Sequence, residues 1–234
     1  MKIGIIVAMD KEFAQLKTLL TESQVERKNY KDFVIGKIGN NEVVMQQCGI
    51  GKVSAAVGAS ELIRRFSPDC IVSTGVAGGI DACLKVTDVV ASQRLVYHDV
   101  WCGDGNEYGQ VQGFPASYEG CPSLLKHALS LNEAGMESRI HSGLVCTGDQ
   151  FITNRTELDT IKQRFPDGLA VDMESAAIAQ TCYLYNVPFL SFRIISDTPG
   201  VEDHASQYAD FWGTMAERSF LTIWTFLSTL PSNL

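Results

Sequence analysis

Short apolar runs alternate with amphipathic segments along most of the 234 residues. Residues 2–7 have the length and β-branched content of a buried strand, and residues 10–20 carry their apolar side chains on one side, as an amphipathic helix does. Residues 32–36 and 42–47 flank Asn40-Asn41 and predict a β-hairpin. The chain therefore begins as a mixture of strands and helices.

The same alternation continues to the end of the chain. A helix over 53–66 stops before Pro68, a buried strand over 70–74 leads into a glycine-rich loop at 75–79, and residues 99–121, with five glycines, predict a long loop. The other expected elements are strands over 88–92, 94–97, 140–147 and 189–195, and helices over 123–131, 157–164, 175–185 and 208–227. We predict one domain, residues 1–234, folded as a three-layer α/β/α sandwich around a central mixed β-sheet.

The composition narrows the class of protein. The net charge is −8 and the 19 basic residues are scattered, which argues against nucleic-acid binding. No apolar run approaches the roughly 18–20 residues of a membrane span, and acidic residues follow the first apolar run too soon for a signal peptide. Seven cysteines without a Cys-x-x-Cys pair are typical of reduced thiols, so we expect a cytoplasmic protein.

Three acidic residues stand where predicted strands end. Glu12 follows the first strand, Glu174 opens the helix over 175–185, and Asp197 ends the run that begins at residue 189. Taken singly, Glu12 and Glu174 are ordinary partners of a helix N-terminus, and Asp197 is an ordinary turn residue. Because strand ends form the rim where open α/β folds bind small molecules, the three together predict acid–base chemistry on an uncharged substrate.

Two glycine-rich segments were candidates for phosphate binding. Residues 49–52 lack the earlier glycine and the Ser or Thr of a phosphate loop, and residues 75–79 have Ala77 where a dinucleotide motif needs glycine. Both follow predicted strands, so we favour close approach of the backbone to a ligand over plain turns. No metal site is expected, because no ligand spacing relates the four histidines, His98, His127, His141 and His204.

Six segments occur together in the order of a known family: Met9 with Glu12, then residues 49–52, 74–79, 148–152, 171–174 and 196–197. From Met1 to about Leu227 the chain resembles the 5′-methylthioadenosine/S-adenosylhomocysteine nucleosidases of the nucleoside phosphorylase superfamily. The resemblance implies a nucleoside phosphorylase-like fold and a cytoplasmic homodimer. It also implies hydrolysis of the bond between adenine and a 5′-thio-substituted ribose, without a metal or an organic cofactor; 5′-deoxyadenosine is a further candidate substrate.

The resemblance implies that Asp197 is the general acid and that Glu12 positions and activates the water. The chemistry supports both roles, because cleavage of a sugar–base bond leaves negative charge on the purine and positive charge on the ribose. We expect burial or a neighbouring carboxylate to raise the pKa of Asp197, so that it holds a proton near neutral pH. Glu12 is expected to stay ionised.

Substrate-binding roles follow from the same resemblance. Glu174, with the backbone of Met173, matches the clamp on the ribose hydroxyls. Phe151 matches the ring that stacks on adenine, the backbone of Ile152 is expected to hydrogen bond to the base, and Arg193 is expected near the water. The remaining members of the expected binding set are Met9, Ile50, Gly78 and Ser196.

The sequence departs from the family in three places. Val76 replaces a serine that is common in relatives, which removes a hydroxyl from the water site. The loop over 99–121 carries Trp101 but lacks other aromatic residues before Glu107, and Gln207 stands where an aromatic residue is common. These changes leave the preferred 5′-substituent open.

Three alternatives therefore remain. The divergent loop permits a nucleosidase for another 5′-modified nucleoside, such as futalosine. A phosphate-dependent nucleoside phosphorylase would need cationic groups, of which Arg193 is the obvious candidate in the matched segments. A nucleoside-binding protein without catalysis would not need three positioned acids.

Overall fold

One mixed β-sheet runs through the computed structural model, which describes residues 1–28, 31–135, 138–198 and 204–233. The strands follow the order β10-β6-β8-β9-β5-β1-β4-β3-β2, and β7 pairs with β6. Their bounds are β1 (Lys2–Val7), β2 (Thr21–Lys28), β3 (Lys31–Ile38), β4 (Asn41–Gln47), β5 (Cys70–Gly79), β6 (Val89–Tyr97), β7 (Tyr118–Glu119), β8 (Ile140–Thr147), β9 (Gly168–Asp172) and β10 (Phe189–Asp197). Strands from both ends of the chain thus share one sheet.

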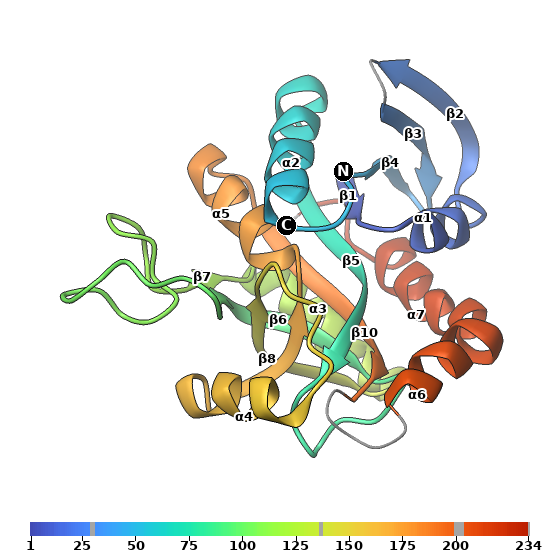
Figure 1. Ribbon diagram of the computed structural model, residues 1–234. Helices are drawn as coiled ribbons and strands as arrows, with labels where there is room; N and C mark the ends of the chain where they lie inside the picture. Colours follow the sequence, from blue (N-terminus) through green and yellow to red (C-terminus); the bar gives the residue numbers. More distant parts are fainter. Residues whose placement is uncertain (29–30, 136–137, 199–203, 234) are drawn as a thin grey trace.

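Five of the strands close into a ring. β10 pairs in parallel with β5 and antiparallel with β6, while β8 joins β6 to β9 and β9 returns to β5. β1 is parallel to β5 and connects the ring to the hairpin of β3 and β4 (Figure 1). In the register of β5 with β10, Asp197 lies beside Gly78. The ends of these two strands therefore meet at one rim.

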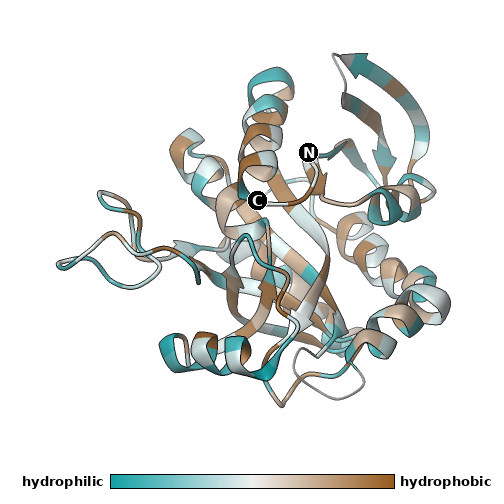
Figure 2. Cartoon of the chain, in the orientation of Figure 1, coloured by the Kyte–Doolittle hydropathy of each residue, from teal (hydrophilic) through white to brown (hydrophobic). Residues whose placement is uncertain are grey.

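Helices cover both faces of the sheet, as the sequence predicts. α2 (Lys52–Phe66) and α5 (Ser175–Tyr185) pack on one face, and α1 (Asp10–Lys17), α3 (Pro122–Ser130) and α7 (Ala216–Ser228) enclose the core on the other. α4 (Arg155–Arg164) packs against β8 and β9. Figure 2 shows the apolar positions concentrated on the strands and on the helix surfaces that face them.

The local sequence explains where the two central helices end. After α2, Ser67 adopts the left-handed conformation and Pro68 follows. After α5, Asn186 does the same with φ 53°, and Pro188 lies two residues further on. A left-handed residue followed by proline is a common way to stop a helix. None of the helices in the described ranges is long and apolar enough to span a bilayer.

The sequence pattern does not predict β2. Its eight residues contain a single large apolar side chain, Val25, which is itself half exposed. β2 pairs with β3 at the outer edge of the sheet, where polar side chains are common. Without an apolar face there is no alternation to detect, and the helix expected over 10–20 ends at Lys17 instead.

The prediction of a glycine-rich loop at 75–79 is wrong, because strand β5 continues through these residues to Gly79. Backbone pairing explains the difference: β10 follows β5 as far as Gly78, and β9 pairs with Gly78 and Gly79. Two neighbouring strands thus supply hydrogen bonds that outweigh the low strand preference of glycine. Gly75 has φ +139°, a conformation that other residues rarely adopt.

The two strands expected over 88–92 and 94–97 are one strand, β6, with an irregular register between Ser92 and Arg94. The single closing helix expected over 208–227 is also not what the structure shows. It consists of α6 (His204–Asp210), a π-helical turn η2 (Phe211–Met215), and α7. A π turn accommodates an extra residue in a helix and is often found at functional sites.

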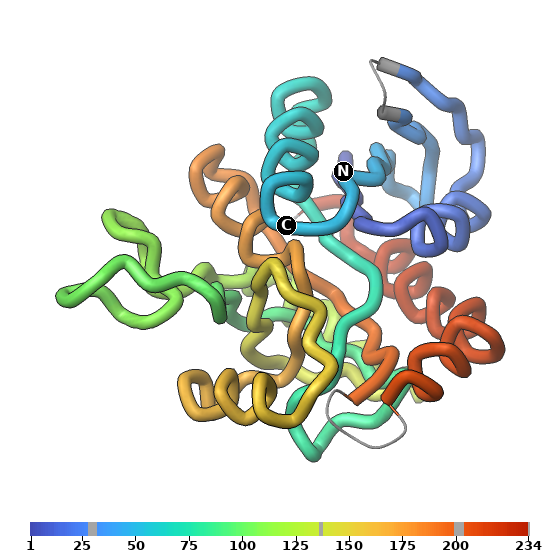
Figure 3. The backbone as a smooth tube through the Cα atoms, viewed as in Figure 1, coloured from blue at the N-terminus to red at the C-terminus, as the bar shows by residue number. Residues whose placement is uncertain are grey.

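Most of the long loop expected over 99–121 is present between β6 and β7, but Tyr118–Glu119, within the expected range, form β7 by pairing with β6. Figure 3 shows it as the green segment that extends away from the strands and helices. At its base, Trp101 stacks on Tyr108, and the Arg164 guanidinium of α4 lies 3.8 Å from the centre of the Tyr108 ring. The loop is thereby attached to α4, while Trp101 remains 54% exposed.

Candidate active site

A cavity of about 360 Å³ opens at the rim where β1, β5, β9 and β10 end. This volume lies within the usual range for small-molecule sites. The side chains and backbone that surround it come from widely separated parts of the sequence. They are Ala8, Met9, Glu12, Ile50, Val76, Ala77, Gly78, Gln150, Phe151, Ile152, Val171, Asp172, Met173, Glu174, Ser196, Asp197 and Tyr208.

Glu12 is held by the backbone at the start of α1. Its Oε2 accepts hydrogen bonds from the N–H groups of Ala8 (3.1 Å) and Met9 (2.9 Å), as in a capping box, and its Oε1 accepts from the N–H of Val76 (2.9 Å). Burial raises the pKa of the carboxyl, while Arg193 and the three N–H groups act in the opposite direction. Glu12 is thus fixed in place and is easier to protonate than an ordinary glutamate.

Gly75 leaves the space that the Glu12 carboxylate occupies. A Cβ atom at this position would lie 2.3 Å from Oε1 of Glu12 and 2.9 Å from Nη1 of Arg193. We expect Gly75→Ala to displace the carboxylate and to lower kcat/KM by about 100-fold, the order of loss that a misplacement of about 1 Å causes. Adenine release measured by chromatography would test this.

Gly113→Ala is the matched control for Gly75→Ala. Gly113 also has a positive φ, +83°, but nothing lies within 4 Å of its Cβ position. This variant carries backbone strain without the clash. Equal activity loss in both variants would show that displacement of Glu12 is not the cause.

Asp197 ends β10 and has both carboxyl oxygens engaged. Ser196 donates a hydrogen bond to Oδ1, and Nε2 of His204 lies 2.8 Å from Oδ2. As expected from the sequence, burial raises the pKa of Asp197; the contacts with Ser196 and His204 act against that rise. A carboxyl in this environment retains its proton to a higher pH than an exposed aspartate does.

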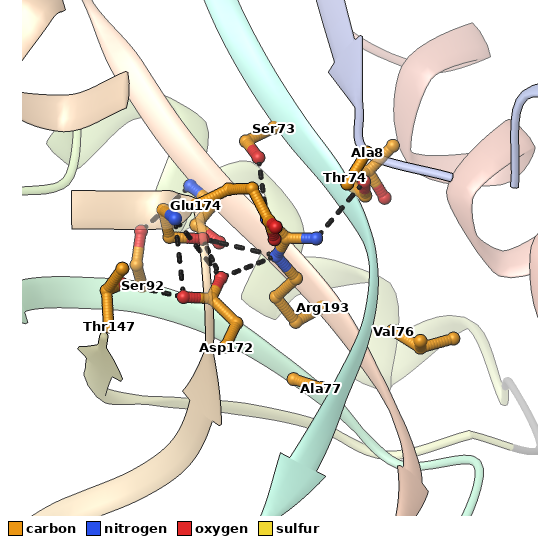
Figure 4. Close-up of polar contacts among 12 residues, drawn as sticks. Ala8, Ser73, Thr74, Val76, Ala77, Ser92, Thr147, Asp172, Glu174 and Arg193 are labelled. Carbon is orange, nitrogen blue, oxygen red and sulfur yellow. Dashed lines mark hydrogen bonds and ion pairs between the residues drawn. The ribbon is translucent and has the colours of Figure 1, made fainter. Parts of the chain in front are cut away.

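Glu174 precedes α5 and faces the buried Arg193, as Figure 4 shows. The backbone N–H of Gly51 donates to its Oε1 at 3.0 Å, and Nη2 of Arg193 lies 3.6 Å from its Oε2. Burial raises the pKa of Glu174 to about 7, Arg193 lowers it, and the nearby Asp172 adds to the rise. The carboxylate is therefore held between a backbone donor and a buried cation.

Arg193 is 1% exposed and its guanidinium is fully engaged. Nε lies 2.9 Å from Oδ2 of Asp172, and Nη2 donates to the Ser73 hydroxyl at 3.0 Å. Burial opposes the charge, but Asp172, Glu174 and Glu12 raise the pKa of Arg193 overall. One cation thus balances three carboxyl groups.

We expect Arg193→Met to destabilise the fold by about 3–5 kcal/mol, because buried acids lose their counterion. Urea unfolding at pH 7 would measure the loss. It should be smaller at pH 5, where the uncompensated carboxyls can bind protons. Exposed Arg64 provides the control variant Arg64→Met. A loss below about 1 kcal/mol for Arg193→Met would contradict the balance described above.

The loop that follows β8 is tied to the turn before α2. The side chain of Lys52 bonds both carboxyl oxygens of Asp99 at 2.8 Å, and the backbone N–H of Lys52 donates to Asp149 at 2.8 Å. The N–H of Asp149 in turn donates to Asp99. This network holds two loops at the same cavity. Ile50 comes from the loop between β4 and α2, and Phe151 comes from the loop between β8 and α4.

The residues expected from the sequence lie around this one cavity, with the exception of Arg193, which is under its floor. Three residues at or next to the site, Asp172, His204 and Tyr208, are not among those expected from the sequence. Asp172 ends a strand directly before the expected Met173-Glu174 pair. That position in the sequence was a signal that its side chain belongs to the site. His204 and Tyr208 are four residues apart on one side of α6, a spacing that also places two side chains together.

Tyr208, rather than Gln207, faces the cavity from α6. Its hydroxyl contacts the Met9 sulfur at 3.9 Å, and its ring meets the Phe151 ring edge-on, with centroids 6.0 Å apart. The Gln207 side chain accepts a hydrogen bond from the N–H of Thr198. Among the described residues, no group of three or more His, Cys, Asp or Glu side chains could hold a metal ion.

Known proteins are similar to this chain in sequence and in fold. A family model described as the phosphorylase superfamily matches residues 2–228. A 5′-methylthioadenosine/S-adenosylhomocysteine nucleosidase from Chromohalobacter salexigens is 43% identical over 206 residues, 88% of each chain.

Solved structures have the same fold over nearly the whole length of this chain. The S-adenosylhomocysteine nucleosidase of Streptococcus pyogenes, in complex with 5-methylthiotubericidin, has a TM-score of 0.92 and 36% identity, covering 99% of this chain and 98% of that one. A 5′-methylthioadenosine/S-adenosylhomocysteine nucleosidase from Colwellia psychrerythraea, in complex with adenine, has a TM-score of 0.93 and 36% identity, covering 100% and 97%.

Proposed function

Because the chain belongs to the 5′-methylthioadenosine/S-adenosylhomocysteine nucleosidases of the phosphorylase superfamily, we infer that it hydrolyses the N-glycosidic bond of these two nucleosides. The products are adenine and the 5′-thio-substituted ribose. The nucleoside phosphorylase-like fold and the enzyme class expected from the sequence are confirmed by the same relatives. Hydrolysis of 5′-deoxyadenosine stays a prediction.

The observation that carries this function is the convergence of three buried carboxyls, Glu12, Glu174 and Asp197, on one cavity. Hydrolysis of a sugar–base bond needs a proton for the leaving base, an activated water, and stabilisation of positive charge on the sugar. Each carboxyl has surroundings suited to one of these tasks.

We assign the proton for the leaving base to Asp197. As the bond between ribose and purine breaks, its electron pair stays on the purine, and Asp197 donates a proton to the imidazole ring of the base. The raised pKa of Asp197 keeps that proton available near neutral pH. Adenine then leaves as a neutral molecule.

We assign the activation of the water to Glu12. Its carboxylate accepts a proton from the water as the oxygen bonds to the ribose carbon. The pKa of Glu12, raised by burial, makes it a better proton acceptor than an ordinary glutamate. Val76 supplies a backbone N–H to this carboxylate, and its apolar side chain contributes no hydroxyl to the water.

The remaining residues suit a nucleoside. Glu174 can accept hydrogen bonds from both ribose hydroxyls and stabilise charge on the ring. Phe151 is 60% exposed at the cavity, which leaves its face free to stack on a base. Met9 and Tyr208 contact each other and line the cavity together, and the Met9 thioether and the Tyr208 ring suit contact with a thioether substituent.

A phosphorylase would need a cation that is free to bind phosphate. In the described part of the chain, the cation nearest the cavity floor is Arg193, and Asp172, Glu174 and Ser73 already occupy its guanidinium. This arrangement favours water over phosphate as the nucleophile.

The test is adenine release from purified protein, followed by chromatography with and without phosphate. The panel contains 5′-methylthioadenosine, S-adenosylhomocysteine, 5′-deoxyadenosine and futalosine. We expect release from the first two without phosphate. Strict dependence on phosphate would identify a phosphorylase, and binding without adenine release over hours would identify a nucleoside-binding protein.

We also propose that the chain is a cytoplasmic homodimer. An exposed apolar surface, here called the α2–α5 face, supports the dimer. It consists of the exposed apolar side chains of the two helices, Val53 and Val57 of α2 and Tyr183 and Leu184 of α5. α2 and α5 lie side by side in Figure 1, and Tyr185 of α5 contacts Ser60 of α2 at 2.8 Å. An apolar surface of this kind marks a protein-binding face.

A charge on the α2–α5 face is expected to separate the subunits. Val53 is 76% exposed, so Val53→Glu leaves the isolated fold intact but places a carboxylate in the proposed interface. Sedimentation at micromolar concentration should show a dimer for the parent and a monomer for this variant. Leu221→Glu, at an exposed position on α7, is the control. A monomeric parent would contradict the proposal.

A further inference from the structure

The general acid has a titratable neighbour that the mechanism above does not use. His204 is the first residue of α6, and its Nε2 lies 2.8 Å from Oδ2 of Asp197. The histidine is 8% exposed and the carboxyl of Asp197 is also buried. Two buried groups at this distance share a directed hydrogen bond, and the position of one proton decides the charge of both.

His204 also contacts the ring expected to stack on the base. The centroid of the His204 imidazole ring is 6.2 Å from the centroid of the Phe151 ring, and the two ring planes meet at an angle of 42°. α6 thus supports two parts of the site at once, the acid through a hydrogen bond and the stacking ring through a packing contact. A substitution at His204 would reach the chemistry only through these neighbours.

The proposed reaction leaves both acids in the wrong protonation state for another cycle. Asp197 has given a proton to the purine, and Glu12 has taken one from water. Glu12 must release its proton, and Asp197 must regain one although it is buried. Imidazole changes charge between about pH 5 and 8, which makes it the usual side chain for such a transfer.

Resting on the function proposed above, we propose that His204 positions Asp197 and returns a proton to it after each turnover. The protonated imidazole transfers the proton on Nε2 to Oδ2 of the Asp197 carboxylate and becomes neutral. It then takes a proton from solvent, while Glu12 releases one, so no net proton is gained or lost. Among the residues that the structure describes, the other titratable groups that line the cavity are Glu12, Asp172, Glu174 and Tyr208.

The test separates the first turnover from later ones in His204→Gln. Glutamine can still hydrogen bond to Asp197, but it does not titrate. With enzyme in excess over 5′-methylthioadenosine, adenine release should stay within about threefold of the parent, whereas steady-state kcat should fall by about tenfold or more. A burst of adenine should precede the slow phase. Added imidazole at pH 7 should accelerate the slow phase.

Two further variants make the result interpretable. His204→Asn should show the same burst and the same response to imidazole. His127→Gln is the control, because His127 lies on α3 and bonds Thr229, away from the cavity. It should match the parent in both phases.

The proposal is overturned if steady-state kcat of His204→Gln stays within about twofold of the parent. It is also overturned if single-turnover and steady-state rates fall together without a response to imidazole, because that result indicates positioning alone. A parent that releases no adenine would instead refute the proposed function.

Discussion

Replacing Asp197 by asparagine is expected to lower kcat by about 10²–10⁴-fold, the usual contribution of a general acid. Asparagine has nearly the shape of aspartic acid and keeps a hydrogen-bond acceptor for Ser196, but it has no acidic proton for the purine. Binding should therefore survive. The measurements are kcat for adenine release and the Kd of a non-hydrolysable analogue, which should change by only a few-fold.

The pH dependence gives a second readout for this variant. In the parent, activity should fall at high pH as Asp197 loses its proton, and the raised pKa moves that fall to a higher pH than an ordinary carboxyl would give. The residual activity of Asp197→Asn should lack this alkaline fall. Asp210→Asn, at an exposed position on the same α6 segment, is the control. A rate within tenfold of the parent would remove Asp197 from the acid role.

Glu12→Gln is expected to have a similarly large effect, about 10²–10⁴-fold in kcat, for two reasons. A neutral amide does not take a proton from the water. In addition, both carboxylate oxygens accept backbone N–H groups, so the NH₂ end of glutamine would face a donor. The parent should lose activity at low pH as Glu12 becomes protonated, and the variant should not show this fall.

Stability provides an independent test at Glu12. Its folded-state pKa is raised above the ordinary value of 4.5, so the folded state binds this proton more strongly than the unfolded state does. Stability of the parent relative to Glu12→Gln should therefore decrease as the pH rises from about 4.5 through the folded-state pKa. Urea unfolding across this range measures it. A difference that is constant with pH would contradict the raised pKa.

The parts of the fold with a strong apolar pattern could be predicted from sequence. β1, the hairpin of β3 and β4, α2 and α5 all combine buried apolar positions with clear stop residues. β2 and the glycine-rich end of β5 could not, because their conformation depends on neighbouring strands and not on their own side chains. The closure of five strands into a ring depends on pairings between distant segments, which no local pattern contains.

The candidate site also contains some residues that could be predicted from the sequence and others that could not. Glu12, Glu174 and Asp197 stand at strand ends, so their meeting at one rim follows from the order of the elements. The buried pairing of Arg193 with Asp172 depends on side-chain packing within the ring of strands. The contact of His204 with Asp197 depends on the path by which α6 approaches the rim, and sequence spacing does not determine that path.

The π turn at Phe211–Met215 affects which side chain of α6 faces the cavity. One additional residue in a helix shifts every earlier side chain by about 100° around the axis. Adding or deleting a residue there would change which side chain of α6 faces the cavity, where Tyr208 lies now, without any substitution in α6 itself. An insertion or deletion in this turn would thus alter the wall of the cavity as directly as a substitution of Tyr208.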